Sequence, residues 1–167
     1  GRKAILNNLL PAVEVEGVLD EAISWREREA ARLEAEAEQL YSCRGPEAWR
    51  SAFAEGSRPR ILLLTSRFTT VLQYVIRDLA EAFRSLGCEA LVLREKRDCE
   101  WSVMFETRQK LCSFRPDLIV QLDHLRAEFG RAIHPAIPYA CWIQDRLPNL
   151  FEPRWIQALG PMDFIFT

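Results

Sequence analysis

Residues capable of binding or acid–base chemistry gather directly after the apolar runs of this sequence. Three groups stand at such positions: Ser66, Arg67, Phe68 and Thr69; Asp123 and His124; and Gln144, Asp145 and Arg146. Histidine and carboxylate side chains can take a proton from a substrate hydroxyl group. We therefore treat Asp123, His124 and Asp145 as candidate catalytic residues, and the other six as candidate substrate-binding residues.

Each candidate also has a structural alternative. Ser66 and Thr69 can cap the helix that follows them, or that helix N-terminus can bind an anion with the help of Arg67. Asp123 and His124 can form a loop pair, or they can orient a sugar or serve as a general base. Asp145 follows an apolar run, and a carboxylate at a buried strand end needs a partner or a ligand.

The elements that position these residues follow an α/β pattern around residues 60–70. Four consecutive aliphatic residues, with Pro59 before them and hydroxyl groups after them, predict a central strand buried on both faces. From Thr69 the apolar spacing becomes helical and continues to Gly87, a suitable residue for ending a helix. Strand, polar turn and amphipathic helix in this order begin a βαβ unit.

Four further strands are predicted along the chain, at Glu89–Leu93, Leu118–Val120, Ile137–Ile143 and Phe164–Phe166. Helical spacing between about residues 101 and 114 separates two of them. This alternation predicts a Rossmann-like α/β fold, an open parallel sheet of about five strands with helices on both faces. In such sheets ligands bind beyond the carboxyl ends of the strands, where all nine candidate residues lie.

An α-helical N-terminal extension is predicted before this fold. Strong helix formers run from about Asp20 to Tyr41, and a short helix follows from Pro46 to Phe53. The linker before Pro59 places the boundary between a helical extension, 1–57, and a Rossmann-like domain, 58–167. The narrow, alanine-rich stripe of the long helix suits packing on a neighbouring surface, and a dimerising coil or another protein partner is the alternative.

Composition limits the possible partners. The net charge of −2, from 22 basic and 24 acidic residues, gives no general field for nucleic acid. No apolar run approaches the roughly 18–20 residues needed to span a membrane. The five cysteines are odd in number and lack Cys-x-x-Cys spacing, which favours reduced thiols in the cytoplasm and no metal site. We expect a soluble cytoplasmic protein without a cofactor.

Several enzyme classes lack their motifs here. No Gly-x-Gly-x-x-Gly or Gly-x-x-x-x-Gly-Lys follows the first strand, which disfavours dinucleotide sites and P-loops. A phosphoacceptor receiver domain needs an acidic pair where Thr65 and Ser66 stand. The Asp-x-His-x-x-Gly of cobalamin binding is missing, because Asp123 and His124 are adjacent. Nothing resembles a nucleophile elbow.

Five stretches carry a resemblance to a known family: Arg60-Ile-Leu-Leu-Leu-Thr-Ser-Arg-Phe-Thr-Thr, Asp78-Leu-Ala-Glu-Ala-Phe-Arg-Ser-Leu-Gly-Cys-Glu-Ala, Phe114-Arg-Pro-Asp-Leu-Ile-Val, Ile137-Pro-Tyr-Ala-Cys-Trp-Ile-Gln-Asp and Met162-Asp-Phe-Ile-Phe-Thr. Over residues 58–167 the chain resembles the N-terminal half of glycosyltransferases of the GT-B fold, which have two Rossmann-like domains. Among these it is most similar to the glycosyltransferase-like spore-maturation group. The chain departs from many such domains in lacking a glycine-rich loop after its first strand.

The resemblance implies the acceptor side of a hexosyltransferase-like enzyme. The nucleotide-sugar donor would then be bound by a second domain expected after Thr167, and the present part would be inactive alone. An apolar run typical of a buried strand closes the sequence, and Gly1 opens it, so we expect an excerpt of a longer protein. The alternative hypothesis is a non-catalytic α/β module that senses a ligand or binds a protein partner through its N-terminal helices.

Overall fold

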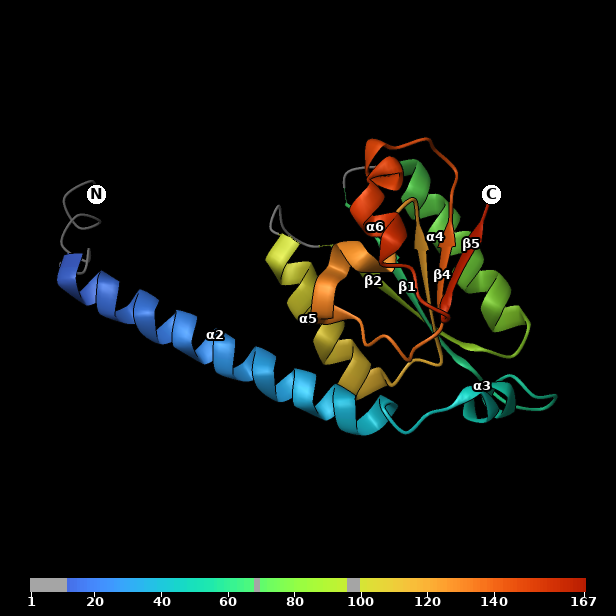
Figure 1. Ribbon diagram of the computed structural model, residues 1–167, viewed down its shortest axis with the longest axis horizontal. Coiled ribbons are helices and arrows are strands. Elements are labelled where there is room, and N and C mark those ends of the chain that lie inside the picture. Colours follow the sequence, from blue (N-terminus) through green and yellow to red (C-terminus); the bar gives the residue numbers. More distant parts are fainter. Residues whose placement is uncertain (1–11, 68–69, 96–99) are drawn as a thin grey trace, which may run out of the picture. The chain divides into compact units, whose positions relative to one another are not determined.

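The computed structural model describes residues 12–67, 70–95 and 100–167, which form an α/β fold preceded by a long helix (Figure 1). The division between two compact units falls between Arg32 and Leu33. The first unit holds the beginning of helix α2 (Ala12–Tyr41), and the second holds the end of that helix and all the elements that follow. The predicted helical extension before the sheet is therefore confirmed.

One sheet of five parallel strands forms the centre of the second unit, in the order β2-β1-β3-β4-β5. The strands are β1 (Arg60–Thr65), β2 (Glu89–Arg94), β3 (Leu118–Leu122), β4 (Tyr139–Trp142) and β5 (Asp163–Phe166). The aliphatic residues of β1 are buried on both faces, as the unbroken apolar run predicted. The open parallel sheet is confirmed, although β4 is shorter than the predicted Ile137–Ile143.

Helices cover both faces of the sheet. Helix α4 (Thr70–Ser85) lies on one side and α5 (Glu100–Phe114) on the other (Figure 1). Ile61 and Leu63 of β1 share a core with Ile76 of α4, whereas Leu62 and Leu64 share a core with the α5 side. This alternation follows from the twofold periodicity of a strand.

The remaining helices are short, apart from α2. They are α3 (Pro46–Ala52), η1 (Arg126–Ala132), η2 (Pro148–Phe151) and α6 (Pro153–Gln157). Helix α2 begins at Ala12 rather than near Asp20, because the residues before Asp20 continue the helix without a proline. Within the described ranges, no helix has the length and apolarity that a bilayer crossing requires.

The end of α2 and the segment that leads through α3 belong with the sheet. Leu33, Ala37 and Tyr41 of α2, together with Trp49 of α3, are buried in the core on the α5 side. The boundary expected between residues 57 and 58 therefore differs from the division in the structure, which lies at Arg32 and Leu33. The linker residues before Pro59 mark a turn within one unit.

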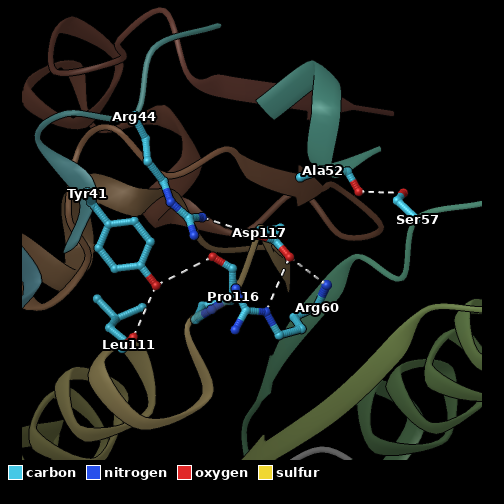
Figure 2. A network of polar contacts seen from close by, with 8 residues as sticks. All are labelled: Tyr41, Arg44, Ala52, Ser57, Arg60, Leu111, Pro116 and Asp117. Atoms are coloured by element: carbon cyan, nitrogen blue, oxygen red, sulfur yellow. Dashed lines mark hydrogen bonds and ion pairs between the residues drawn. The ribbon is translucent and has the colours of Figure 1, made fainter. Parts of the chain in front are cut away.

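A buried carboxylate joins this segment to the first and third strands (Figure 2). Asp117, which precedes β3, accepts hydrogen bonds from the Arg60 backbone N–H at 2.9 Å and from Arg44 Nη1 at 3.0 Å. The Tyr41 hydroxyl donates to the Leu111 carbonyl at 3.0 Å, and burial raises the pKa of Tyr41 well above its usual value. These bonds connect the end of α2 and the residues that follow it with α5, the start of β1 and the start of β3.

We predict that Asp117→Ala lowers the free energy of unfolding by about 1–3 kcal/mol, because it leaves the Arg60 N–H without its acceptor. Arg44 and Arg60 stay partly exposed and can regain water, which keeps the loss below that of a fully buried ion pair. Urea unfolding followed by circular dichroism measures the change.

Asp78→Ala is the matched control, because the Arg77–Asp78 pair is exposed on both sides. Its removal is expected to change the free energy of unfolding by less than about 0.5 kcal/mol. Equal losses for the two variants would contradict the role assigned to Asp117.

Candidate functional site

The strand order locates the site where ligands bind in sheets of this kind. The chain moves from β1 outward to β2 and then returns to β3 on the other side of β1, so the order reverses between β1 and β3. Leu64 of β1 is level with Gln121 of β3. Continuing this register brings Ser66 level with Asp123. Two of the predicted groups therefore meet at the reversal point, where the carboxyl ends of parallel strands bind ligands.

Asp123 is a buried anchor at this edge. Its side chain is 0% exposed, and its backbone has a φ of 57°, a left-handed conformation that aspartate tolerates. Oδ1 accepts hydrogen bonds from the backbone N–H groups of Gln144 at 2.7 Å and Asp145 at 3.0 Å. Oδ2 is buried and has no hydrogen-bond partner among the described residues. This enclosed carboxylate holds the chain leaving β4 and offers no surface to a substrate.

His124 and Glu128 form a dyad beside that anchor. His124 Nδ1 lies 2.9 Å from Glu128 Oε2, and the histidine side chain is 36% exposed. Glu128 also accepts hydrogen bonds from the Leu125 N–H at 2.7 Å and from Asn149 Nδ2 at 2.9 Å. A carboxylate at Nδ1 favours the tautomer whose Nε2 accepts a proton. The arrangement can therefore act as a general base.

The carboxylate of the dyad is held in its charged form. Burial by itself would raise the pKa of Glu128, but hydrogen bonds from His124, Asn149 and the Leu125 N–H outweigh it and lower that pKa. Asn149 Nδ2 also donates to the Asp123 carbonyl at 3.0 Å, and the Tyr139 hydroxyl donates to the His124 carbonyl at 2.9 Å. The dyad thus sits in a fixed frame of neighbouring polar groups.

A further carboxylate stands beside the end of β1. Glu95 Oε2 lies 3.4 Å from both Ser66 Oγ and the Arg67 N–H, and Gln73 Nε2 donates to the Arg67 carbonyl at 2.9 Å. An anion bound at this turn would meet the negative charge of Glu95. The arrangement favours ligands that donate hydrogen bonds, and the anion site at Ser66 and Arg67 stays a prediction. Phe68 and Thr69 lie outside the described residues.

The third predicted group lies after β4 and is exposed. Gln144 and Asp145 are bound through their backbones to Asp123, and Arg146 follows them at the surface. The expectation that Asp145 stands at a buried strand end is wrong, because β4 ends at Trp142 and Asp145 lies beyond it. Asp123 is the buried carboxylate of this edge.

The Cys141 thiol at the end of β4 is poorly suited to nucleophilic chemistry. Burial, with a smaller contribution from the charge of Asp123, raises the pKa of the Cys141 thiol to about 11, so the reactive thiolate is scarce at neutral pH. Among the described residues, Cys43, Cys88, Cys112 and Cys141 form no disulfide bond. Within the described part of the chain, no group of three or more His, Cys, Asp or Glu side chains is placed to hold a metal ion.

Sequence reasoning missed three residues of this site: Glu95, Glu128 and Asn149. Glu128 stands four positions after His124, a spacing that could have drawn attention to it. Asn149 is 25 residues from His124 and reaches the dyad only through the chain path between β4 and β5. Glu95 approaches the end of β1 because β2 pairs beside it. No local pattern points to these two residues.

We predict that Asp123→Ala destabilises the fold and that Asp145→Asn does not. The alanine removes the acceptor of two backbone N–H groups and places a side chain less suited to a positive φ, which together cost about 2–4 kcal/mol. Asp145 is exposed, so its replacement should change the free energy of unfolding by less than about 0.5 kcal/mol. Denaturant unfolding of both variants and of the parent protein measures the two changes in the free energy of unfolding.

We also predict a pH dependence that arises from Glu128. Because its pKa is lower in the folded protein than the ordinary 4.5, its charge stabilises the fold above that value. This contribution is lost as the pH falls through the lowered pKa. The difference in the free energy of unfolding between the parent and Glu128→Gln should be largest at neutral pH and should shrink on acidification.

Urea unfolding as a function of pH measures this difference, and Glu81→Gln, an exposed position on α4, serves as the control. A difference that grew on acidification would contradict the lowered pKa of Glu128. The control is expected to stay close to the parent throughout.

Comparison with known proteins gives no relative for this arrangement. No protein-family model matches the chain, and neither a curated protein nor a solved structure does. The chemistry of this site therefore has to be inferred from its side chains and from the strand order.

Proposed function

We propose that this chain is the acceptor-side domain of a glycosyltransferase that uses a nucleotide-sugar donor. The observation that carries the proposal is the His124–Glu128 dyad at the carboxyl end of β3, beside the reversal of strand order. The resemblance of residues 58–167 to the N-terminal half of GT-B enzymes agrees with it. Because a fold alone does not determine function, the proposal depends on the dyad rather than on the resemblance.

The dyad can perform the proton transfer that sugar transfer needs. His124 Nε2 takes the proton of an acceptor hydroxyl while Glu128 holds the imidazole by Nδ1. The hydroxyl oxygen then bonds to the anomeric carbon of the donor sugar, and the bond from that carbon to the phosphate oxygen breaks. The nucleoside diphosphate leaves with the electron pair. The half-exposed His124 suits this role better than the enclosed Asp123 or the surface Asp145.

The charges at this edge agree with a hydroxylated acceptor. Glu95 and Glu128 lie beside the ends of two neighbouring strands and accept hydrogen bonds. Sugar hydroxyl groups donate hydrogen bonds to carboxylates, whereas phosphates are repelled by them. The donor diphosphate would therefore bind on a second domain, and this domain would receive the acceptor.

The second candidate function is a protein-interaction module. Helix α2 exposes a set of apolar side chains in the first unit, including Val18, Leu19 and Trp25, each more than half exposed. Such side chains on a long helix can bind a partner helix. In that case the polar edge of the sheet would sense a ligand without transforming it.

We predict that saccharides bind at the carboxyl ends of β1 and β3 of this chain. Two-dimensional NMR of the ¹⁵N-labelled protein, titrated with a panel of mono- and disaccharides, should show shifts centred on Ser66, His124 and Gln144. Inorganic phosphate should cause no such shifts. In a protein that also holds the donor domain, His124→Gln should lower kcat about 10²–10⁴-fold with UDP-, GDP- or TDP-sugars.

Glu81→Gln is the matched control and should leave both binding and turnover unchanged, because it lies on α4. If no saccharide shifts the resonances of the folded chain, and no nucleotide sugar binds when the donor domain is present, the transferase proposal fails. Shifts confined to α2 on addition of a partner protein would favour the interaction module.

A further inference from the structure

The side-chain amide of Asn149 lies among three hydrogen-bond acceptors at the turn that follows β3. Its Nδ2 is 2.9 Å and 3.1 Å from the two carboxylate oxygens of Glu128, and 3.0 Å from the carbonyl oxygen of Asp123. Only the nitrogen end of the amide can donate to such atoms, because its oxygen end is an acceptor. The orientation of the Asn149 amide is therefore determined by its neighbours.

The chain on both sides of Asn149 keeps this amide in place. Before it, the two backbone N–H groups that follow β4 donate to Asp123 Oδ1. After it, Leu150 is buried in the core on the α5 side. An amide held in this way loses little further conformational entropy when it binds Glu128, so it can hold the carboxylate in one orientation.

The protonation state of Glu128 decides which nitrogen of His124 can accept a proton. Glu128 Oε2 lies 2.9 Å from Nδ1 of the imidazole. An ionised carboxylate accepts the hydrogen of Nδ1 and leaves a lone pair on Nε2, whereas a protonated carboxyl group donates to Nδ1 and leaves the hydrogen on Nε2. Only the first arrangement lets Nε2 act as a general base.

Asn149 favours the ionised carboxylate. Burial raises the pKa of Glu128, and hydrogen bonds from His124, Asn149 and the Leu125 N–H lower that pKa by more. The Leu125 N–H belongs to the same turn as Glu128, three positions away, and His124 is the side chain to be oriented. Among these three donors, Asn149 is the one that comes from a different segment of the chain.

Two other titratable side chains that interact with Glu128 do not take over this role. Burial raises the pKa of Tyr139, and it raises the pKa of the Cys141 thiol to about 11, so both groups are neutral at neutral pH. The Tyr139 hydroxyl donates to the His124 carbonyl rather than to the carboxylate. The charge of Glu128 therefore depends on the donors that bind it, and Asn149 contacts both of its oxygens.

We propose that Asn149 is the positioning residue of the dyad. Its amide keeps Glu128 a hydrogen-bond acceptor, which keeps the hydrogen of neutral His124 on Nδ1 and leaves Nε2 to take the proton of an acceptor hydroxyl. Asn149 acts through Glu128 and need not touch the substrate. The role of Asn149 in turnover rests on the proposed function, whereas its effect on His124 does not, so the two can be tested separately.

Long-range ¹H–¹⁵N NMR of the histidine rings distinguishes the two neutral tautomers from each other and from the imidazolium ion. At a pH of about 8, above the usual range of histidine, His124 of the parent should carry its hydrogen on Nδ1. Asn149→Ala should give a mixture of both tautomers. Asn149→Asp places a second carboxylate beside Glu128, and such a pair retains a proton more readily, so the Nδ1 tautomer should be lost there too.

Gln157→Glu is the matched control, because it changes an amide into a carboxylate at an exposed position of α6 and should leave the His124 spectrum as in the parent. His134, whose Nε2 lies 2.9 Å from Glu38 Oε2, should keep its spectrum in every variant. Circular dichroism shows that each variant is folded. A parent whose His124 carries its hydrogen on Nε2, or an Asn149→Ala spectrum identical with that of the parent, would overturn the proposal.

The effect on turnover needs a protein that also holds the donor domain. There, Asn149→Ala should lower kcat about 10–100-fold, as part of the contribution of proton transfer, and leave the KM for the acceptor nearly unchanged. An unchanged kcat in a variant whose tautomers are mixed would overturn the role of Asn149 in turnover. A parent without transferase activity would overturn the proposed function, and the spectra would still decide whether Asn149 orients His124.

Discussion

Strand β3 has a buried carboxylate at each end, and each carboxylate accepts hydrogen bonds from backbone N–H groups of a neighbouring segment. The arrangement of the second unit depends on this constraint. Asp117 binds the N–H that begins β1, and Asp123 binds two N–H groups that follow β4. A buried carboxylate without donors is costly, so each one requires its neighbouring strand to stay in place. The register of β1, β3 and β4 is thereby held at the two ends of the strands.

The fold was predictable because its signals are local. The strand β1 shows in four consecutive aliphatic residues, and Gly87 ends α4 with a φ of 88°, a conformation that glycine adopts without strain. The division of the chain was not predictable in the same way. Glycine and proline before β1 predict a break in regular structure, whereas the contacts of Leu33 and Trp49 with the sheet depend on tertiary packing that no short pattern contains.

The candidate site was predictable in place but not in the roles of its members. Parallel strands bring Asp123 and His124 to the same edge as Ser66, which the alternation of elements already implied. Which carboxylate becomes buried depends on where β4 ends and on the left-handed turn at Asp123. The sequence analysis expected the buried carboxylate at Asp145, whereas the structure buries Asp123. Asn149 reaches the dyad from a distant short helix, so its role became visible only in the folded chain.

The two carboxylates next to His124 show how one turn separates structure from chemistry. Asp123 is enclosed and accepts hydrogen bonds from the backbone, so it can position the turn but cannot meet a substrate. Glu128 holds a histidine that remains partly exposed and free to face a ligand. In sheets of this kind, ligands approach beyond the carboxyl ends of the strands, where this turn lies.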